Sequence, residues 1–205
     1  MTSIAPEQYE HCSLQVSKAW RDLVFDGQLW TKLDLRAFPE LPNSALSRLS
    51  RLSRGFVRQL NLTGHTNLTS AILSDVITNI SMPHLANGDL SHTNLTEVNL
   101  RGCSKLTTQG LHHLLIRSPW LRKLCLKGLG CVTNMTCDIL AVHCSKLISL
   151  DLSRCSNLAG EGIQSWATAV LNRKDTLELK ELRLCGLRRV TDEMMAQLGD
   201  RKSVV

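Results

Sequence analysis

The chain has 205 residues with a formal net charge of +6; 43% of the residues are hydrophobic and only 4% are aromatic. Its basic residues are dispersed rather than gathered in a run, and few aromatic side chains are present for bases to stack on, so we expect no nucleic-acid binding. No stretch approaches the roughly 18 apolar residues of a membrane span, and no basic segment followed by an apolar run opens the chain, so we expect no membrane insertion, no secretory signal, and a cytoplasmic and/or nuclear location.

The N-terminal segment, residues 11–31, differs from the rest of the chain. Two groups of its large apolar side chains carry the prediction, which are Val16, Trp20 and Leu23 and then Leu29 and Trp30. The first group has helical spacing and predicts a short amphipathic helix with one apolar face. We expect residues 1–10 to be disordered and residues 11–31 to cover the apolar end of the repeats that follow.

Residues 32–198 contain a pattern that returns about every 26 residues. The clearest copy runs from Leu95 to Leu111 and reads L-x-x-V-x-L-x-x-C-x-x-L-T-x-x-G-L. One aligned column of the pattern consists of Leu35, Leu62, Leu100, Leu126, Leu152 and Leu184. A fixed period that places the same residue class in each column is typical of a solenoid, here with six units.

Each unit combines two hydrophobic periods. The L-x-L core alternates apolar and polar residues, as a short strand with one buried face does. Leu111, Leu114 and Leu115 then recur at spacings of three and four, as on the inner face of a helix. One strand and one helix cannot bury their apolar faces alone, so the units must stack. We therefore predict an α/β solenoid with a curved parallel sheet inside and helices outside.

Two insertions interrupt the period. The first lies in residues 81–92, is rich in turn-forming residues, and is interpreted either as a loop or as a degenerate extra strand. The second lies in residues 172–177 and is polar, which favours a surface loop. Residues 199–205 form a tail after the last unit, and the absence of a closing cap there suggests a piece of a longer array.

The eight cysteines do not indicate a disulfide framework or a metal site. No C-x-x-C spacing occurs, and Cys103 and Cys155 fall on a repeat column, which is typical of small buried side chains. The pairs His112-His113 and His143-Cys144 are explained by helix-surface and loop positions of the repeat. No nucleophile, acid–base pair or phosphate loop is visible, so we expect no enzymatic activity, no metal and no cofactor.

The columns resemble leucine-rich repeats of the cysteine-containing, RNI-like type, with Cys103 and Cys155 at the cysteine position and Gly110 and Gly162 at the start of the helix. The string from Cys12 to Trp30, C-x-x-x-V-S-K-x-W-x-x-L-x-x-D-x-x-L-W, resembles the C-terminal half of an F-box. Together they resemble the F-box/leucine-rich-repeat proteins, which are substrate receptors of SCF-type ubiquitin ligases.

This resemblance implies a role in ubiquitin-dependent protein degradation, with two partners. One is the SCF adaptor subunit, contacted through Val16, Trp20, Leu23, Leu29 and Trp30. The other is a protein substrate on the concave strands. The first half of an F-box should precede Cys12, and residues 1–11 do not match it. The alternative is a repeat scaffold, or a truncated fragment, without ligase attachment.

Side chains between the buried leucines of each strand should face the concave side. Basic residues gather there, and they are Arg101, Lys123, Lys127, Arg154 and Arg183. Such a cluster predicts binding of an acidic or phosphorylated segment, because Arg101 can grip a carboxylate or phosphate with two parallel hydrogen bonds. The alternative interpretation is a solvated surface of mixed charge.

Overall fold

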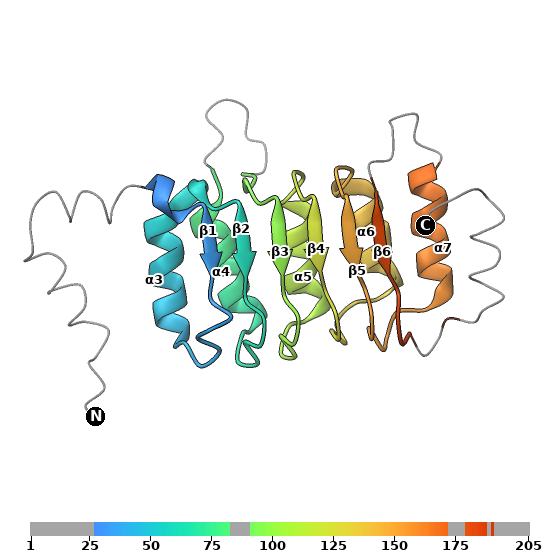
Figure 1. The fold of residues 1–205 in the computed structure, drawn as a ribbon, viewed down its shortest axis with the longest axis horizontal. Helices are drawn as coiled ribbons and strands as arrows, with labels where there is room; N and C mark the ends of the chain where they lie inside the picture. Colours follow the sequence, from blue (N-terminus) through green and yellow to red (C-terminus); the bar gives the residue numbers. More distant parts are fainter. Residues whose placement is uncertain (1–26, 83–90, 172–178, 188–189, 191–205) are drawn as a thin grey trace, which may run out of the picture.

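The computed structural model describes residues 27–82, 91–171, 179–187 and 190. Its described part contains one parallel sheet of six short strands in the order of the chain, β1 to β6. The strands are β1 (Lys32–Asp34), β2 (Gln59–Asn61), β3 (Glu97–Asn99), β4 (Lys123–Cys125), β5 (Ser149–Asp151) and β6 (Glu181–Arg183). The predicted sheet of a repeat solenoid is confirmed (Figure 1).

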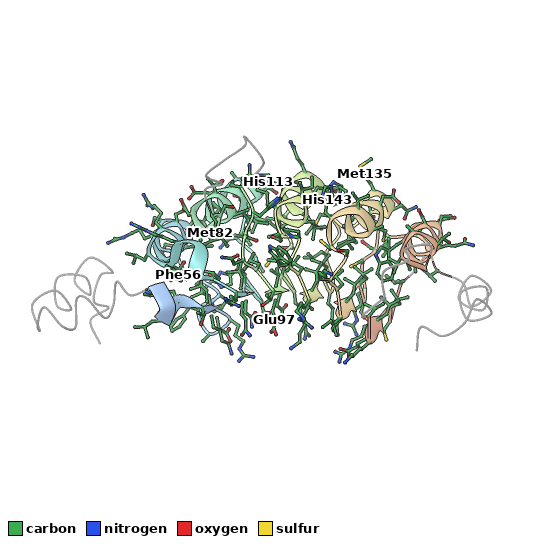
Figure 2. The ribbon with its side chains drawn as sticks, turned by 90° about the horizontal axis from the view of Figure 1, so that it is seen from above. Phe56, Met82, Glu97, His113, Met135 and His143 are labelled. Atoms are coloured by element: carbon green, nitrogen blue, oxygen red, sulfur yellow. The ribbon has the colours of Figure 1, made fainter. Side chains whose placement is uncertain are left out.

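Helices alternate with these strands. The α-helices of the described part are α3 (Asn43–Ser53), α4 (Ser70–Ile80), α5 (Thr108–Ile116), α6 (Asn134–His143) and α7 (Gly160–Leu171). Two short 3-10 helices are also present, η1 (Gly27–Trp30) and η2 (Arg54–Phe56). The α-helices form one layer behind the sheet, so that Glu97 lies on the strand side and His113 and Met135 on the helix side (Figure 2). None of the described helices has the length and apolar character required to cross a membrane.

The register of the sheet follows the repeat columns without a shift. Leu33 pairs with Leu60, Leu60 with Val98, and Val98 with Leu124, and the series continues to Leu182. A slip of one residue would turn every leucine to the wrong face, so burial of one face pins the register. The alternation seen in the sequence therefore fixes which side chains form the groove.

The core lies between the sheet and the helices. Leu60, Leu124 and Leu150 are 1%, 2% and 0% exposed, and Val76, Leu114 and Leu140 of the helices close the layer from behind. Burying one such side chain contributes roughly 1.5–3 kcal/mol. Neighbouring units share this continuous core, which gives the sheet a rigid backing.

Two glycines allow the helices to approach one another. A Cβ on Gly162 of α7 would lie 2.7 Å from Cα of Asn134 in α6, and one on Gly110 of α5 would lie 3.0 Å from Cα of Ser70 in α4. Real Cβ atoms essentially never come within 3.0 Å of another heavy atom. The repeat therefore needs glycine at the start of these helices because the backbones pack closely.

The predicted burial of Cys103 and Cys155 is confirmed, and each of the two thiols ties its unit to the one before. Cys103 and Cys155 are 1% and 0% exposed. The Cys103 Sγ donates to the carbonyl oxygen of Leu62 at 3.1 Å, and the Cys155 Sγ donates to that of Leu126 at 3.2 Å. His65 occupies the same column, and its Nε2 lies 3.0 Å from the Leu35 carbonyl oxygen. In these three units the column thus supplies a polar side-chain atom that bonds to a backbone carbonyl oxygen of the preceding unit.

The first insertion is closed at its base by backbone pairing. Ser81 and Thr93 form an isolated antiparallel bridge, and the Met82 N–H donates to the His92 carbonyl oxygen at 2.9 Å. The buried Thr93 hydroxyl lies 2.8 Å from that of Ser118 and so ties this base to the following unit. Residues 83–90 of this insertion, and the whole second insertion, lie outside the described residues.

The N-terminal prediction is only partly within the described residues. Residues 1–26, with Val16, Trp20 and Leu23, lie outside them, as do residues 191–205. In η1, Trp30 is half-buried against the core, whereas Leu29 is 57% exposed.

Candidate functional site

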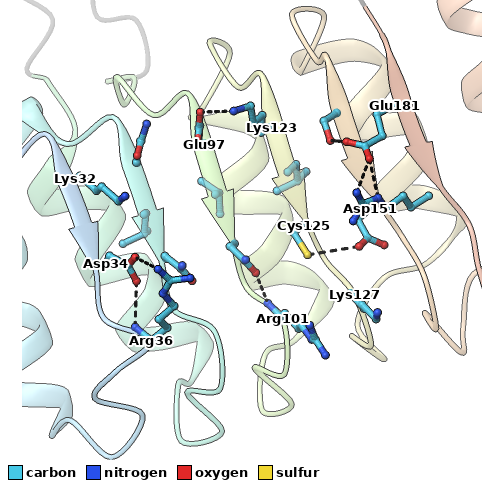
Figure 3. A pocket seen from close by; sticks show the side chains of 18 residues that line it. Lys32, Asp34, Arg36, Glu97, Arg101, Lys123, Cys125, Lys127, Asp151 and Glu181 are labelled. Carbon is cyan, nitrogen blue, oxygen red and sulfur yellow. Dashed lines mark hydrogen bonds and ion pairs between the residues drawn. The ribbon is translucent and has the colours of Figure 1, made fainter.

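The concave face of the sheet forms a groove of about 450 Å³ (Figure 3). Ten of its lining side chains carry charge. The basic ones are Lys32, Arg36, Arg101, Lys123, Lys127 and Arg183, and the acidic ones are Asp34, Glu97, Asp151 and Glu181. The six basic and four acidic side chains leave two positive charges in excess.

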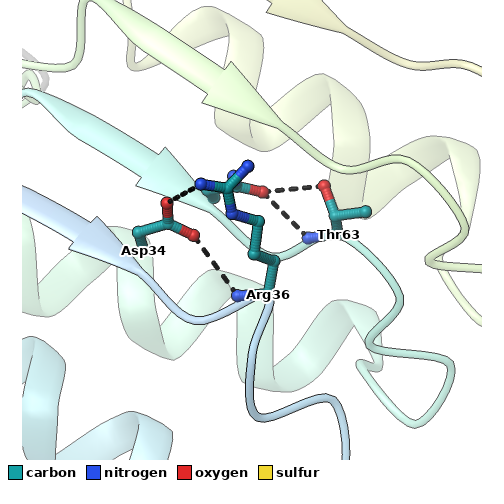
Figure 4. Close-up of polar contacts among 4 residues, drawn as sticks. Asp34, Arg36 and Thr63 are labelled. Atoms are coloured by element: carbon teal, nitrogen blue, oxygen red, sulfur yellow. Dashed lines mark hydrogen bonds and ion pairs between the residues drawn. The ribbon is translucent and has the colours of Figure 1, made fainter.

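The polar residues at the ends of the strands shape the exits of the groove. The Asn99 Oδ1 accepts from the N–H of Arg101 at 3.1 Å, and the Asp151 Oδ1 accepts from that of Ser153 at 2.9 Å. Figure 4 shows the equivalent contact in the first unit, where the Arg36 N–H donates to Asp34 Oδ1. Asn and Asp commonly bond to the backbone N–H two residues on. The sequence predicted that Asn99 and Asp151 face the groove. It did not reveal that their side chains also hold the backbone N–H of the residue two positions further on.

Two of the predicted basic residues are neutralised by neighbours. The Lys123 Nζ lies 2.9 Å from Glu97 Oε1, across β3 and β4. The Arg183 guanidinium lies 2.6 Å from Glu181 Oε1, and the Ser149 hydroxyl donates to the other oxygen of Glu181 at 2.8 Å. The Ser149 hydrogen bond, followed by that of Arg183, lowers the pKa of Glu181, while the Glu181 contact raises the pKa of Arg183. These two cations are therefore already ion-paired within the groove.

At the first strand, Arg36 is paired in the same way. One of its guanidinium nitrogens lies 3.2 Å from Asp34 Oδ2. On the next unit, the Thr63 hydroxyl donates to Asn61 Oδ1 at 2.7 Å (Figure 4). Asp34 and Asn61 are therefore both engaged at this end of the groove.

A thiol and a buried carboxylate lie at the centre of the groove. Asp151 is 8% exposed, and the Cys125 Sγ donates to its Oδ2 at 3.9 Å. Burial raises the pKa of the Cys125 thiol, an effect opposed by the backbone N–H of Lys127 and the charge of Arg101 and reinforced by Asp151. The thiol is therefore protonated at neutral pH and acts as a weak hydrogen-bond donor.

Arg101 and Lys127 differ from Arg36, Lys123 and Arg183, which are ion-paired. Neither has an acidic partner among the residues that the structure describes, and Lys32 is the third groove cation of which this holds. Arg101 follows β3 and Lys127 follows β4, so the two stand at the exits of neighbouring strands (Figure 3). The predicted cluster of Arg101, Lys123 and Lys127 thus reduces to a pair of available cations.

Arg154 lies beside the groove rather than in its lining. It occupies the turn after β5 with φ of 60°, in the column where four other units have glycine at φ between 69° and 84°. Its Cγ lies 3.3 Å from the position that a Cβ on Gly186 would take. The side chain consequently extends over the next turn.

Of the predicted adaptor-binding residues, only Leu29 and Trp30 are described, and neither lines the groove. Leu29 is exposed on η1, whereas Trp30 is engaged with the core and serves the fold. Val16, Trp20 and Leu23 belong to the part of the chain without a described position. No group of three or more His, Cys, Asp or Glu side chains in the described ranges is arranged to hold a metal ion.

Comparison with known proteins identifies the fold. No protein-family model and no curated protein sequence matches the chain. Among solved structures, the chain is similar to one in the crystal structure of the Rad7 and Elc1 complex in yeast, with a TM-score of 0.58 and 20% sequence identity over 78% of this chain and 37% of that one. It is also similar to the tropomodulin C-terminal domain of Caenorhabditis elegans, with a TM-score of 0.51 and 12% identity over 78% and 90% of the two chains. The chain therefore spans well under half the length of the first of these structures.

Proposed function

We propose that the chain is a protein-recognition module that holds a segment of a partner protein in its concave groove. The observation that carries this proposal is the groove itself, in which polar and charged side chains stand in three columns on a rigid parallel sheet. Solenoids characteristically bind their partners on such extended concave surfaces.

We further propose that the module selects substrates for an SCF-type ubiquitin ligase in the cytoplasm or nucleus. The support is the resemblance of Cys12–Trp30 to the C-terminal half of an F-box, directly before repeats of the cysteine-containing type. The similar yeast structure is a complex of Rad7 with a second protein, Elc1, which is compatible with a repeat chain that has a protein partner. Function is not transferred from this fold, since repeat folds host many functions.

The groove assignment can be tested by site-specific photo-crosslinking. A photoreactive amino acid replaces Gln59, which lines the groove, or Thr78, which is exposed on α4. Irradiation of cells that express each variant should yield crosslinked partner proteins at position 59 and not at position 78. Equal crosslinking at both positions would refute the concave groove as the recognition surface.

The ligase assignment needs a separate test, which is a pull-down of the purified SCF adaptor subunit. We expect weak capture by the wild-type chain and loss of capture by Leu29→Asp. Leu29 is exposed, so the new aspartate would remove an apolar contact surface without placing a charge in the core. Val142→Asp is the matched control, since Val142 is 67% exposed on α6. If the adaptor is not captured, the chain is a repeat scaffold without ligase attachment.

A further inference from the structure

We infer that Arg101 and Lys127 form the anchor for a phosphorylated serine or threonine of the bound partner segment. This inference rests on the proposed protein-binding function and names the chemistry of the partner. It concerns two neighbouring side chains of the groove rather than its overall positive charge.

Every acidic side chain of the groove lining is already engaged. Asp34 pairs with Arg36, Glu97 with Lys123, and Glu181 with Arg183. The fourth, Asp151, receives the N–H of Ser153 and the thiol of Cys125. The groove acids are thus paired with Arg36, Lys123 and Arg183 or with uncharged donors, and none forms an ion pair with Arg101 or Lys127 within the described ranges.

The backbones that carry the two cations are held in place. The Arg101 N–H donates to Asn99 Oδ1 at 3.1 Å, and its carbonyl oxygen accepts from the Gly64 N–H at 2.8 Å. Gly128, directly after Lys127, donates its N–H to the Ser153 carbonyl oxygen at 2.8 Å. The two side chains therefore start from fixed points one strand apart, a separation of about 4.8 Å in a sheet. Two long side chains at that spacing can reach one ligand group.

The charge and geometry of the pair fit a phosphate monoester better than a single carboxylate. A phosphorylated side chain carries about −1.5 to −2 charges and three acceptor oxygens at pH 7. Arginine contributes a planar fork that binds two oxygens, and lysine contributes a point charge for the third. A glutamate would neutralise only one of the two cations. We therefore expect a phosphorylated segment to bind more tightly than its glutamate counterpart.

The test is an array of degenerate peptides with a central phosphoserine, each accompanied by its unphosphorylated and glutamate versions. Peptides that bind are then measured in solution against the double variant Arg101→Gln with Lys127→Gln. The matched control is Arg51→Gln with Lys146→Gln, which removes the same charge from exposed residues outside the groove. A single-stranded oligonucleotide is included as a second source of phosphate.

We expect phosphopeptide affinity to fall roughly tenfold or more in the groove variant, because it loses hydrogen bonds to a charged group. The affinity should change little in the control. Glu97→Gln should strengthen binding several-fold, because it releases Lys123 beside the pair. The inference is refuted by a loss below about twofold, by equal binding of unphosphorylated peptides, or by an oligonucleotide that binds better than any peptide. Crosslinking at position 59 without dependence on Arg101 and Lys127 would refute this inference and leave the proposed function standing.

Discussion

The substitution Leu126→Ala tests the register on which the groove depends. Leu126 is fully buried at the exit of β4, and its backbone is bonded on both sides, with its N–H donating to Asp151 O at 2.9 Å and its carbonyl oxygen accepting from Cys155 Sγ at 3.2 Å. Alanine keeps these backbone bonds and removes the buried side chain. A leucine-to-alanine change in a core costs about 2–5 kcal/mol. For a chain of this size, a loss of about 3 kcal/mol lowers the melting temperature by about 6–12 °C.

Circular dichroism during heating measures this change, and two further variants serve as controls. Leu184 occupies the same column but is partly exposed, so Leu184→Ala should cost less. Lys127→Asp reverses a partly exposed charge one residue further on and should change stability by about 0.5 kcal/mol or less. If Leu126→Ala and Lys127→Asp lower the melting temperature equally, the assignment of leucines to the core and lysines to the groove is wrong.

Three further predictions concern the turns and the thiols. Gly128→Ala should lower the free energy of unfolding by about 1 kcal/mol in urea denaturation, because Gly128 has φ of 78° and no atom lies within 4 Å of a new Cβ, which leaves only the left-handed strain. Arg154→Gly, at φ of 60°, should not lower it, and a clear loss there would contradict this account of the turns. Thiol labelling of native protein should modify the exposed Cys185 rapidly and reach Cys103 and Cys155 only on unfolding; rapid labelling of the latter two would contradict their burial. Burial raises the pKa of Cys103 from 9.0 to about 12, so above pH 9 the unfolded chain loses a proton that the folded chain keeps, and stability falls as pH rises. Compared with wild type, Cys103→Ala should therefore show a slope of unfolding free energy between pH 9 and 12 that is shallower by up to ~1.4 kcal/mol per pH unit, and an unchanged slope would show that this thiol does not titrate in that range.

The sequence predicted the sheet well because two periods reinforce each other in it. Alternation within L-x-L places leucines inward, and the repeat places equivalent leucines side by side, so that Leu60, Val98 and Leu124 pair as their columns indicate. Burial of the cysteine column followed from the same logic. His65 was missed there, although its position three residues after Leu62 matches that of Cys103 after Leu100 and was available as a signal.

The state of the groove charges was beyond sequence reasoning. The columns indicate which residues face the groove, but the pairing of Lys123 with Glu97 depends on side-chain conformations across two strands. The role of Asn99 as a backbone acceptor was likewise hidden, because the column also contains Cys125 and Arg183, which cannot make the same carboxylate or amide contact. The bridge between Ser81 and Thr93 has no counterpart in the repeat, so no period could reveal it.

Stability and recognition reside in alternate residues of the same strands, and this separation makes the groove testable. Along β4, Lys123 and Cys125 face the groove while Leu124 is 2% exposed in the core. The ion pairs of the groove are solvent-accessible, and such pairs typically contribute about 0–1 kcal/mol to stability. Removing groove charges should therefore leave the array folded. The same substitutions should lower the affinity for a partner that contacts those charges. Loss of binding in a groove variant with an unchanged melting temperature then reports on recognition alone.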